Sequence, residues 1–158
     1  MLRFAKIILN SLILSLATTG VLMTVEPSAA SSTKFVHGPV TAQLINVVDG
    51  DTVVVDAEPW PNTTIRIFVR LRDIDTPEMK SKCVSLRKAA KAAKIALSEL
   101  LDGQTLTLHN ISGGEYYGRI IADIQTEHGT SASQTLLNSG HAIPDKSRKL
   151  NRICRTNS

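Results

Sequence analysis

Cysteine and histidine are scarce in this 158-residue chain, which contains two cysteines and four histidines. The histidines are scattered and do not cluster with the cysteines, which argues against a zinc site. We find no internal repeat, no low-complexity tract and no sign of a second domain. Hydrophobic residues make up 42% of the chain, so the composition does not favour disorder. These features indicate one globular domain with a modest core.

The longest apolar run stands at the start of the chain. Arg3 and Lys6 precede the uncharged residues 7–25, and the small residues Ser28 and Ala30 follow. This order is typical of a secretory signal peptide, with cleavage expected after Ala30. An uncleaved anchor is the alternative, because the run approaches membrane-spanning length. We therefore expect an exported protein, periplasmic or secreted, without stable membrane association after cleavage. The expected segments are a signal peptide over 1–30, a flexible leader over 31–38 and a folded domain over 39–158.

Export also changes how the two cysteines are interpreted. Cys83 and Cys154 both lie after the expected cleavage site. An even number of cysteines in an oxidising compartment favours a disulfide bridge between them. Two independent buried thiols are the alternative.

The remainder of the chain alternates strand-like and helix-like segments. Apolar and polar residues alternate over 65–72, which is typical of a half-buried strand. Over 81–103, apolar residues recur at three- and four-residue spacing, which is typical of a helix that Gly103 would end. Ser131 and Gln134 form a capping box for a second helix. Strands are expected at 40–48, 52–57, 65–72, 105–109 and 119–126, and helices at 81–103 and 131–140.

This order of elements predicts the fold class. Three strands, a helix, two strands and a second helix are the order of the OB-fold, so we expect a mainly β protein with helices (α+β) built on a five-stranded β-barrel. Residues 58–62 contain two prolines and are expected to be a loop that ends the second strand.

Two acidic motifs flank the second and third expected strands. Asp51 lies in the turn sequence DGDT, and Asp75 lies in DTPE just after the third strand. Barrel closure would bring the two carboxylates into one site, where they repel each other unless a hard cation such as Ca²⁺ or Mg²⁺ binds. Arg70 precedes Asp75 by five residues, and its guanidinium is suited to bind two phosphate oxygens. Glu78, which follows the rigid Thr76–Pro77 step, is a candidate to orient or deprotonate a water molecule.

The combination of DGDT, then Arg70 with DTPE, then YGR over 117–119 closely resembles the staphylococcal nuclease (thermonuclease) family, in its exported bacterial form. The resemblance runs from about residue 40 to residue 142 in the same order and spacing. It implies an OB-fold enzyme, a phosphodiesterase that cleaves single-stranded DNA and RNA with Ca²⁺ as cofactor and acts as a monomer. It implies carboxylate ligands at Asp51 and Asp75, a carbonyl ligand at Thr76, phosphate-binding catalytic arginines at Arg70 and Arg119, a general base at Glu78 and a substrate contact at Tyr117.

The chain also departs from the family pattern. Tyr116 stands where some members have a lysine before the Tyr-Gly-Arg step, and the tyrosines that flank the base pocket in the best-known member have no counterpart in HAIPDKSRK over 141–149. Two other functions stay open: a nucleic-acid-binding module without catalysis, and an accessory protein of envelope or exopolysaccharide metabolism. A basic run at Lys80, Lys82, Arg87, Lys88, Lys91 and Lys94 is either a solvated helix face or a surface that guides DNA.

Overall fold

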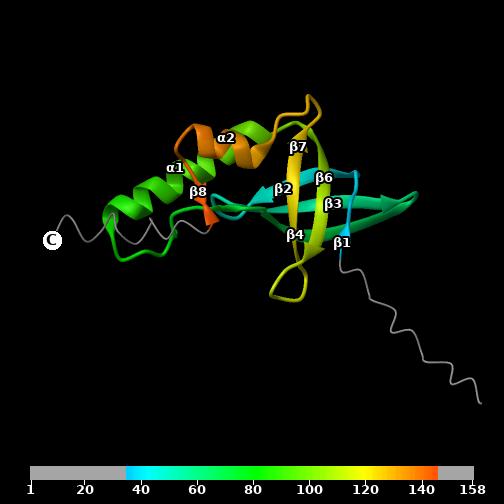
Figure 1. Ribbon diagram of the computed structural model, residues 1–158, viewed down its shortest axis with the longest axis horizontal. Coiled ribbons are helices and arrows are strands. Elements are labelled where there is room, and N and C mark those ends of the chain that lie inside the picture. The colour runs from blue at the N-terminus through cyan, green and yellow to red at the C-terminus, as the bar shows by residue number, and fades with distance from the viewer. Residues whose placement is uncertain (1–34, 146–158) are drawn as a thin grey trace, which may run out of the picture. The chain divides into compact units, whose positions relative to one another are not determined.

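A closed five-stranded β-barrel forms the body of the protein in the computed structural model, which describes residues 35–145 (Figure 1). The strands follow the order β6-β2-β3-β4-β7, and pairing between β6 and β7 closes the barrel. All neighbours are antiparallel except β4 and β7, which are parallel. This arrangement with two helices confirms the predicted α+β OB-fold class. The barrel strands are β2 (Val40–Val47), β3 (Thr52–Trp60), β4 (Thr63–Leu71), β6 (Thr105–Gly113) and β7 (Arg119–Thr126).

Two helices and three short strands complete the fold. The helices α1 and α2 contact each other and lie at one end of the barrel (Figure 1). The strand β1 pairs with β6 at the edge of the sheet, while β5 and β8 form a separate two-stranded ribbon. No helix within residues 35–145 is long and apolar enough to cross a membrane. These elements are β1 (Phe35–Val36), β5 (Ile74–Asp75), α1 (Val84–Leu101), α2 (Ala132–Asn138) and β8 (Ile143–Pro144).

The core sits inside the barrel and under the helices. Val53 and Val55 of β3 point inward and are fully buried, as are Leu106 and Leu108 of β6. Their two-residue spacing places them on one face of each strand. Leu97 of α1 joins the same cluster, so the helix and the barrel share one hydrophobic core.

The helix α1 has the apolar stripe that the sequence predicts. Leu86, Ala90, Ala93 and Leu97 are buried along one face, with Leu101 as the last buried residue. The helix starts three residues later than expected, at Val84, and ends at Leu101. The chain then leaves the helix through Gly103, whose φ of 67° is a left-handed conformation that glycine adopts freely.

The capping box of α2 forms only in part. The Ser131 side chain accepts a hydrogen bond from the backbone N–H of Gln134 at 3.3 Å, as predicted. The Gln134 side chain does not return to Ser131 and instead donates to Asn138 Oδ1 at 2.8 Å. One orphan N–H group at the start of the helix is therefore satisfied by a side chain.

Residues 58–60 continue the strand β3 instead of ending it, so the loop predicted from two prolines was wrong. Pro59 lies where the β3–β4 register shifts between Ala57 and Trp60. At such a bulge not every residue donates its backbone N–H to the neighbouring strand, which is why a proline is tolerated there. The turn itself is only Pro61–Asn62, and Asn62 has a positive φ of 62°.

Residues at both ends of the described range make pairings that the sequence did not predict. Phe35–Val36, expected in the flexible leader, pairs as β1 with Ile111 and Ser112 of β6. Ile143–Pro144, which follows the last element expected from the sequence, pairs as β8 with β5. The predicted signal peptide and Cys154 lie outside the described residues, so the cleavage and the Cys83–Cys154 bridge stay predictions.

Gly50 allows α1 to pack tightly on the turn between β2 and β3. A Cβ at this position would lie 2.7 Å from Ala93 Cβ and 2.8 Å from Thr76 Oγ1. Gly50→Ala should therefore lower the free energy of unfolding by about 1–3 kcal/mol, because both neighbours are buried and would have to shift. Urea unfolding monitored by circular dichroism measures the change.

Gly113→Ala is the matched control. A Cβ at Gly113 meets nothing within 4 Å, and its φ is not in the left-handed region. This control should change stability by less than about 0.5 kcal/mol. Equal stabilities for the two variants would show that α1 does not pack closely against Gly50.

Candidate active site

The pairing of β3 with β4 places Asp51 beside Arg70. Thr52 and Arg70 are register partners, and Leu71 N–H donates to the Asp51 carbonyl at 2.8 Å. Asp51 therefore lies just before β3, opposite the end of β4. The sequence predicted that barrel closure would bring Asp51 near Asp75, whereas the register of the β3–β4 hairpin is what places Asp51 beside Arg70.

The Asp51 carboxylate is buried, with only 3% of the residue exposed, and protein donors surround it. Oδ1 accepts from Arg70 Nη1 at 2.6 Å and from Thr52 Oγ1 at 3.0 Å. Oδ2 accepts from the Thr76 backbone N–H at 3.2 Å and from Thr76 Oγ1 at 3.1 Å. Four donors thus hold the side chain in one orientation, which is the pre-organisation that a binding site requires.

The pKa of Asp51 is raised from 3.8 to about 6. Burial is the main cause, because a desolvated carboxylate resists ionisation, and the nearby charge of Asp49 adds to it. Arg70 and the hydroxyl groups of Thr52 and Thr76 act in the opposite direction. A further positive charge near Asp51 would therefore stabilise its ionised carboxylate.

Arg70 bridges the two carboxylates that the sequence had placed together. Its Nη1 donates to Asp51, and its Nη2 lies 3.4 Å from Asp75 Oδ1. Asp75 is half-exposed at the end of β5, directly after the turn that follows β4. The structure thus brings Asp51, Arg70 and Asp75 into one cluster.

Arg119 comes to the same place through the parallel pairing of β4 with β7. Phe68 is the register partner of Arg119, and Arg70 is the partner of Ile121. Since side chains two residues apart share a face of a strand, Arg70, Arg119 and Ile121 lie on one face. All three line a pocket of about 360 Å³.

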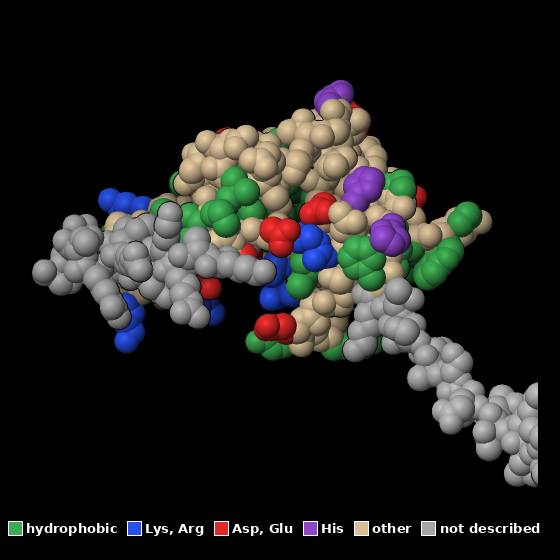
Figure 2. Space-filling view, viewed as in Figure 1, with side chains coloured by type: hydrophobic (Ala, Val, Ile, Leu, Met, Phe, Trp, Pro, Cys, Tyr) green, Lys and Arg blue, Asp and Glu red, His purple; other side chains and the backbone are tan. Residues whose placement is uncertain are grey.

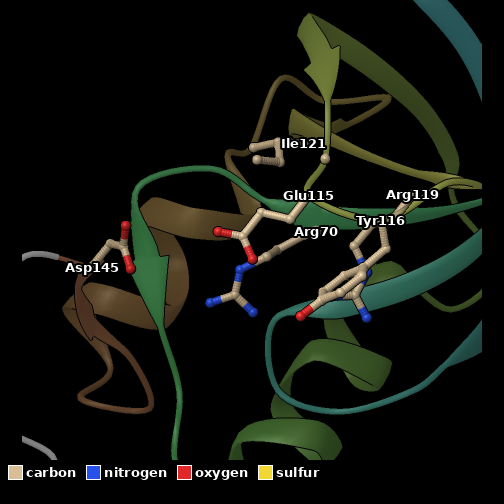
Figure 3. A pocket seen from close by; sticks show the side chains of 7 residues that line it. Arg70, Glu115, Tyr116, Arg119, Ile121 and Asp145 are labelled. Atoms are coloured by element: carbon tan, nitrogen blue, oxygen red, sulfur yellow. The ribbon is translucent and has the colours of Figure 1, made fainter.

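Three further side chains line this pocket, and the sequence did not identify them as site residues. Glu115 and Tyr116 come from the turn between β6 and β7, and Asp145 follows β8. Arg70 reaches between that turn and Asp145 (Figure 3). Acidic and basic side chains gather near the middle of this face of the molecule (Figure 2). The sequence could have indicated Glu115, because it lies in the segment just before YGR. Asp145 is placed only by the β5–β8 pairing and by the hydrogen bond that its N–H donates to the Asp73 carbonyl at 3.1 Å.

Two predicted site residues lie away from the pocket. The Glu78 side chain is exposed and makes no hydrogen bond or ion pair within the described residues, and it does not line the pocket with the arginines. Tyr117 is fully exposed at 109%, and it does not line the pocket either. Their roles as general base and substrate contact stay predictions.

Arg72, the second arginine of the stretch around Arg70, is a structural residue. Its Nη2 donates to the Asn110 carbonyl, to Ser112 Oγ at 2.8 Å and to the Ile121 carbonyl at 3.1 Å. These bonds tie the end of β4 to β6 and β7, the two strands whose pairing closes the barrel.

The oxygen atoms of Asp51 and Asp75 are ligands of the kind that a hard divalent cation prefers. Within residues 35–145, no group of three or more His, Cys, Asp or Glu side chains could hold a metal ion. Asp51 and Asp75 are nevertheless two carboxylates that already share one positive group, the Arg70 guanidinium. Oxygen ligands suit Ca²⁺, which also accepts backbone carbonyls and water. Asp51, Asp75 and the Thr76 carbonyl are the residues that would hold it.

Residues 68–153 match the family model described as staphylococcal nuclease homologue. The chain belongs to this family. The membership predicted from DGDT, DTPE and YGR is thereby confirmed, and the staphylococcal nuclease family is generally one of phosphodiesterases. The match includes Arg70, Asp75 and Arg119 but begins after Asp51, so the place of Asp51 in the site rests on the geometry described above.

A relative of this staphylococcal nuclease homologue is an uncharacterized protein of Bacillus anthracis. The two are 31% identical over 106 residues, which cover 66% of this chain and 47% of the relative. The chain therefore spans about half the length of the curated relative it matches.

The raised pKa of Asp51 predicts how stability depends on pH in calcium-free protein. Because the folded-state pKa of about 6 exceeds the ordinary 3.8, the associated stability is complete below pH 3.8 and is lost as pH rises through 6. Asp51→Asn is always neutral and escapes this loss. Its stability relative to the wild type should rise by on the order of 3 kcal/mol between about pH 4 and about pH 7, as urea unfolding with a chelator would measure.

Asp56→Asn provides the comparison for this pH series. The Arg66 side chain is hydrogen-bonded to Asp56 and holds its pKa below 3.8. The stability of Asp56→Asn relative to the wild type should therefore not rise over the same pH window. A flat profile for Asp51→Asn as well would contradict the raised pKa of Asp51.

Proposed function

We propose that this protein is an exported Ca²⁺-dependent nuclease that hydrolyses phosphodiester bonds of DNA and RNA. The observation that carries the proposal is the pocket where Arg70 and Arg119 lie on one face of two neighbouring strands, beside the carboxylates Asp51 and Asp75. Membership of the staphylococcal nuclease family supports it.

The two arginines suit the charge changes of phosphodiester hydrolysis. When a nucleophile attacks the phosphorus, negative charge grows on the equatorial oxygens. Guanidinium groups fixed where this charge develops lower the barrier, since they bind the transition state more strongly than the substrate. Arg70 and Arg119 reach the pocket from β-strands and not from loops, so their positions are well defined.

The carboxylates would hold the cofactor next to these arginines. Bound calcium supplies positive charge at the phosphate and lowers the pKa of a coordinated water molecule. Arg70 donates to both carboxylates in the structure, and guanidinium nitrogens that they do not engage would be available to the phosphate. Arg70 would in this way act as the partner of the carboxylates in the free protein and of the substrate in the complex.

The exported state remains part of the proposal. It is supported by the order of charges, apolar residues and small residues over 1–30. We also propose that Cys83 pairs with Cys154 in the oxidising compartment and that the protein acts as a monomer on single-stranded substrates.

The lysines in α1 and just before it provide a second feature that fits a polyanionic substrate. We define the α1 basic surface as the exposed residues Lys80, Lys82, Lys88 and Lys91, none of which has an ion pair among residues 35–145. Glu99 is the only acidic residue in α1. Basic side chains project at the α1 end of the molecule (Figure 2). A bound polyanion would supply the negative charge that balances them.

The helix α1 borders the proposed site directly. Lys94 Nζ donates to the Val48 carbonyl at 3.2 Å, and Ala93 lies against Gly50 in the turn that carries Asp51. A nucleic acid held at the arginines would therefore be close to an element with several unpaired cations. The surface would add affinity that depends on salt and not on sequence.

The central test is hydrolysis of single-stranded DNA by the protein without residues 1–30. We expect cleavage with Ca²⁺, none with a chelator and none for Asp51→Ala. Arg70→Lys and Arg119→Lys should each lower kcat about a hundredfold with KM little changed, because lysine cannot donate to two phosphate oxygens at once.

Arg66→Lys is the matched control, since Arg66 lies on the same strand and is paired with Asp56 on the surface. Its kcat should equal that of the wild type. If the protein binds DNA but does not cleave it in Ca²⁺, it is a non-catalytic binding module. If the arginine variants raise KM without lowering kcat, the two arginines only dock the substrate.

The α1 basic surface has its own test in the salt dependence of binding. Lys88→Gln and Lys91→Gln should each reduce the slope of log affinity against log salt by about 0.7, as expected for one lost phosphate contact on a single strand. Fluorescence anisotropy of a labelled oligonucleotide with a chelator present measures this without cleavage. Arg66→Gln removes one exposed charge elsewhere on the barrel and should leave the slope unchanged, whereas equal slopes for all three variants would show that α1 is only a solvated face.

A further inference from the structure

The two tyrosines of the chain are neighbours, but only one faces the pocket. Tyr116 lines the pocket together with Arg70 and Arg119, and 66% of it is exposed. Tyr117 is fully exposed and lies outside the pocket lining. The ring of Tyr116 lies beside Arg119 in the close-up of the pocket (Figure 3).

The structure holds the Tyr116 ring next to the guanidinium of Arg119. The central carbon of that guanidinium lies 5.7 Å from the ring centroid, a cation–π contact. The backbone supports the contact, since Arg119 N–H donates to the Tyr116 carbonyl at 3.2 Å and Gly114 N–H donates to the Arg119 carbonyl at 2.9 Å. The ring is therefore fixed against one charged group while much of its surface stays open.

The rest of the pocket gives the open ring surface a specific chemical setting. The other side chains that line it are Arg70, Arg119, Glu115 and Asp145, which are charged, and Ile121. Such a site would bind a phosphate at the arginines and leaves one aromatic surface next to it. A nucleotide has this combination, because its phosphate is linked through a sugar to a flat base with a π-face.

We propose that Tyr116 is a stacking platform for an unpaired nucleobase next to the phosphate held by Arg70 and Arg119. The inference rests on the proposed function, since it takes the arginines as the phosphate site. Bases inside a duplex already stack on both faces, so the platform accepts a base only from a single strand or an unstacked end. Tyr116 would in this way select single-stranded over double-stranded substrates.

Binding of two oligonucleotides of equal length tests the stacking directly. One is oligo(dT) and the other has the same backbone without bases; both are labelled and measured by anisotropy with a chelator present. We expect Tyr116→Ala to weaken binding of oligo(dT) roughly 5- to 100-fold, the range for one lost base–aromatic stack. Binding of the abasic oligonucleotide should stay the same, and Tyr116→Phe should retain the affinity of the wild type.

Trp60→Ala is the matched control, because Trp60 is an aromatic residue of nearly the same exposure, 65%, that does not line this pocket. It should bind both oligonucleotides as the wild type does. Thermal unfolding should show that Tyr116→Ala folds normally, as expected for an exposed side chain.

Several results would overturn the inference. One is a wild type that binds oligo(dT) no more tightly than the abasic oligonucleotide, and another is an equal loss of affinity for both in Tyr116→Ala. A loss confined to Tyr117→Ala would assign the platform to the neighbouring tyrosine. The proposed hydrolysis fails separately, if the wild type shows base-dependent binding but does not cleave with Ca²⁺; the stacking would then stand without catalysis.

Discussion

The Arg70 guanidinium between Asp51 and Asp75 is the interaction on which the site depends. Asp51 is buried at 3% exposure, and a buried carboxylate without positive charge nearby would be strongly destabilising. The pair forms only if β3 and β4 keep the register that sets Thr52 opposite Arg70. Its second contact requires β5 to follow β4 at once. The pairing of the barrel strands thus determines the geometry of the site. A shift of the register by one residue would turn Arg70 to the other face of the sheet.

Those parts of the fold that depend on local periodicity were predictable from sequence. The alternation in β4 and the apolar stripe of α1 each come from neighbours within a few residues, so the pattern alone identifies them. Pro59 was misjudged because its effect depends on a bulge, which is a property of the strand pair and not of one strand. The short strands β1, β5 and β8 have two residues each, too few for any period, and long-range pairing alone defines them.

The candidate site divides in the same way. Asp51, Arg70 and Asp75 lie at strand ends, where a motif fixes both the residue and its direction, and the structure brings them together. Tyr116 and Tyr117 lie in a turn that ends at Gly118 with a φ of 80°, and no period tells which ring faces inward. Asp145 enters the pocket from a segment more than twenty residues beyond Arg119, through pairing with β5. Side chains from turns and distant segments are placed by tertiary contacts that a single sequence does not display.

The parallel pairing of β4 with β7 gives the protein a late step of assembly. Phe68 and Arg119 are partners across about fifty residues, with α1 and β6 between them in the chain. Contacts of such long sequence separation form slowly, because the intervening loop must close first. The hairpin of β3 and β4 can form with Asp51 next to Arg70 while Arg119 is still far away. In a nascent or truncated chain, Asp51 and Arg70 would therefore lie together before the pocket exists. The pocket is complete only when the barrel has closed.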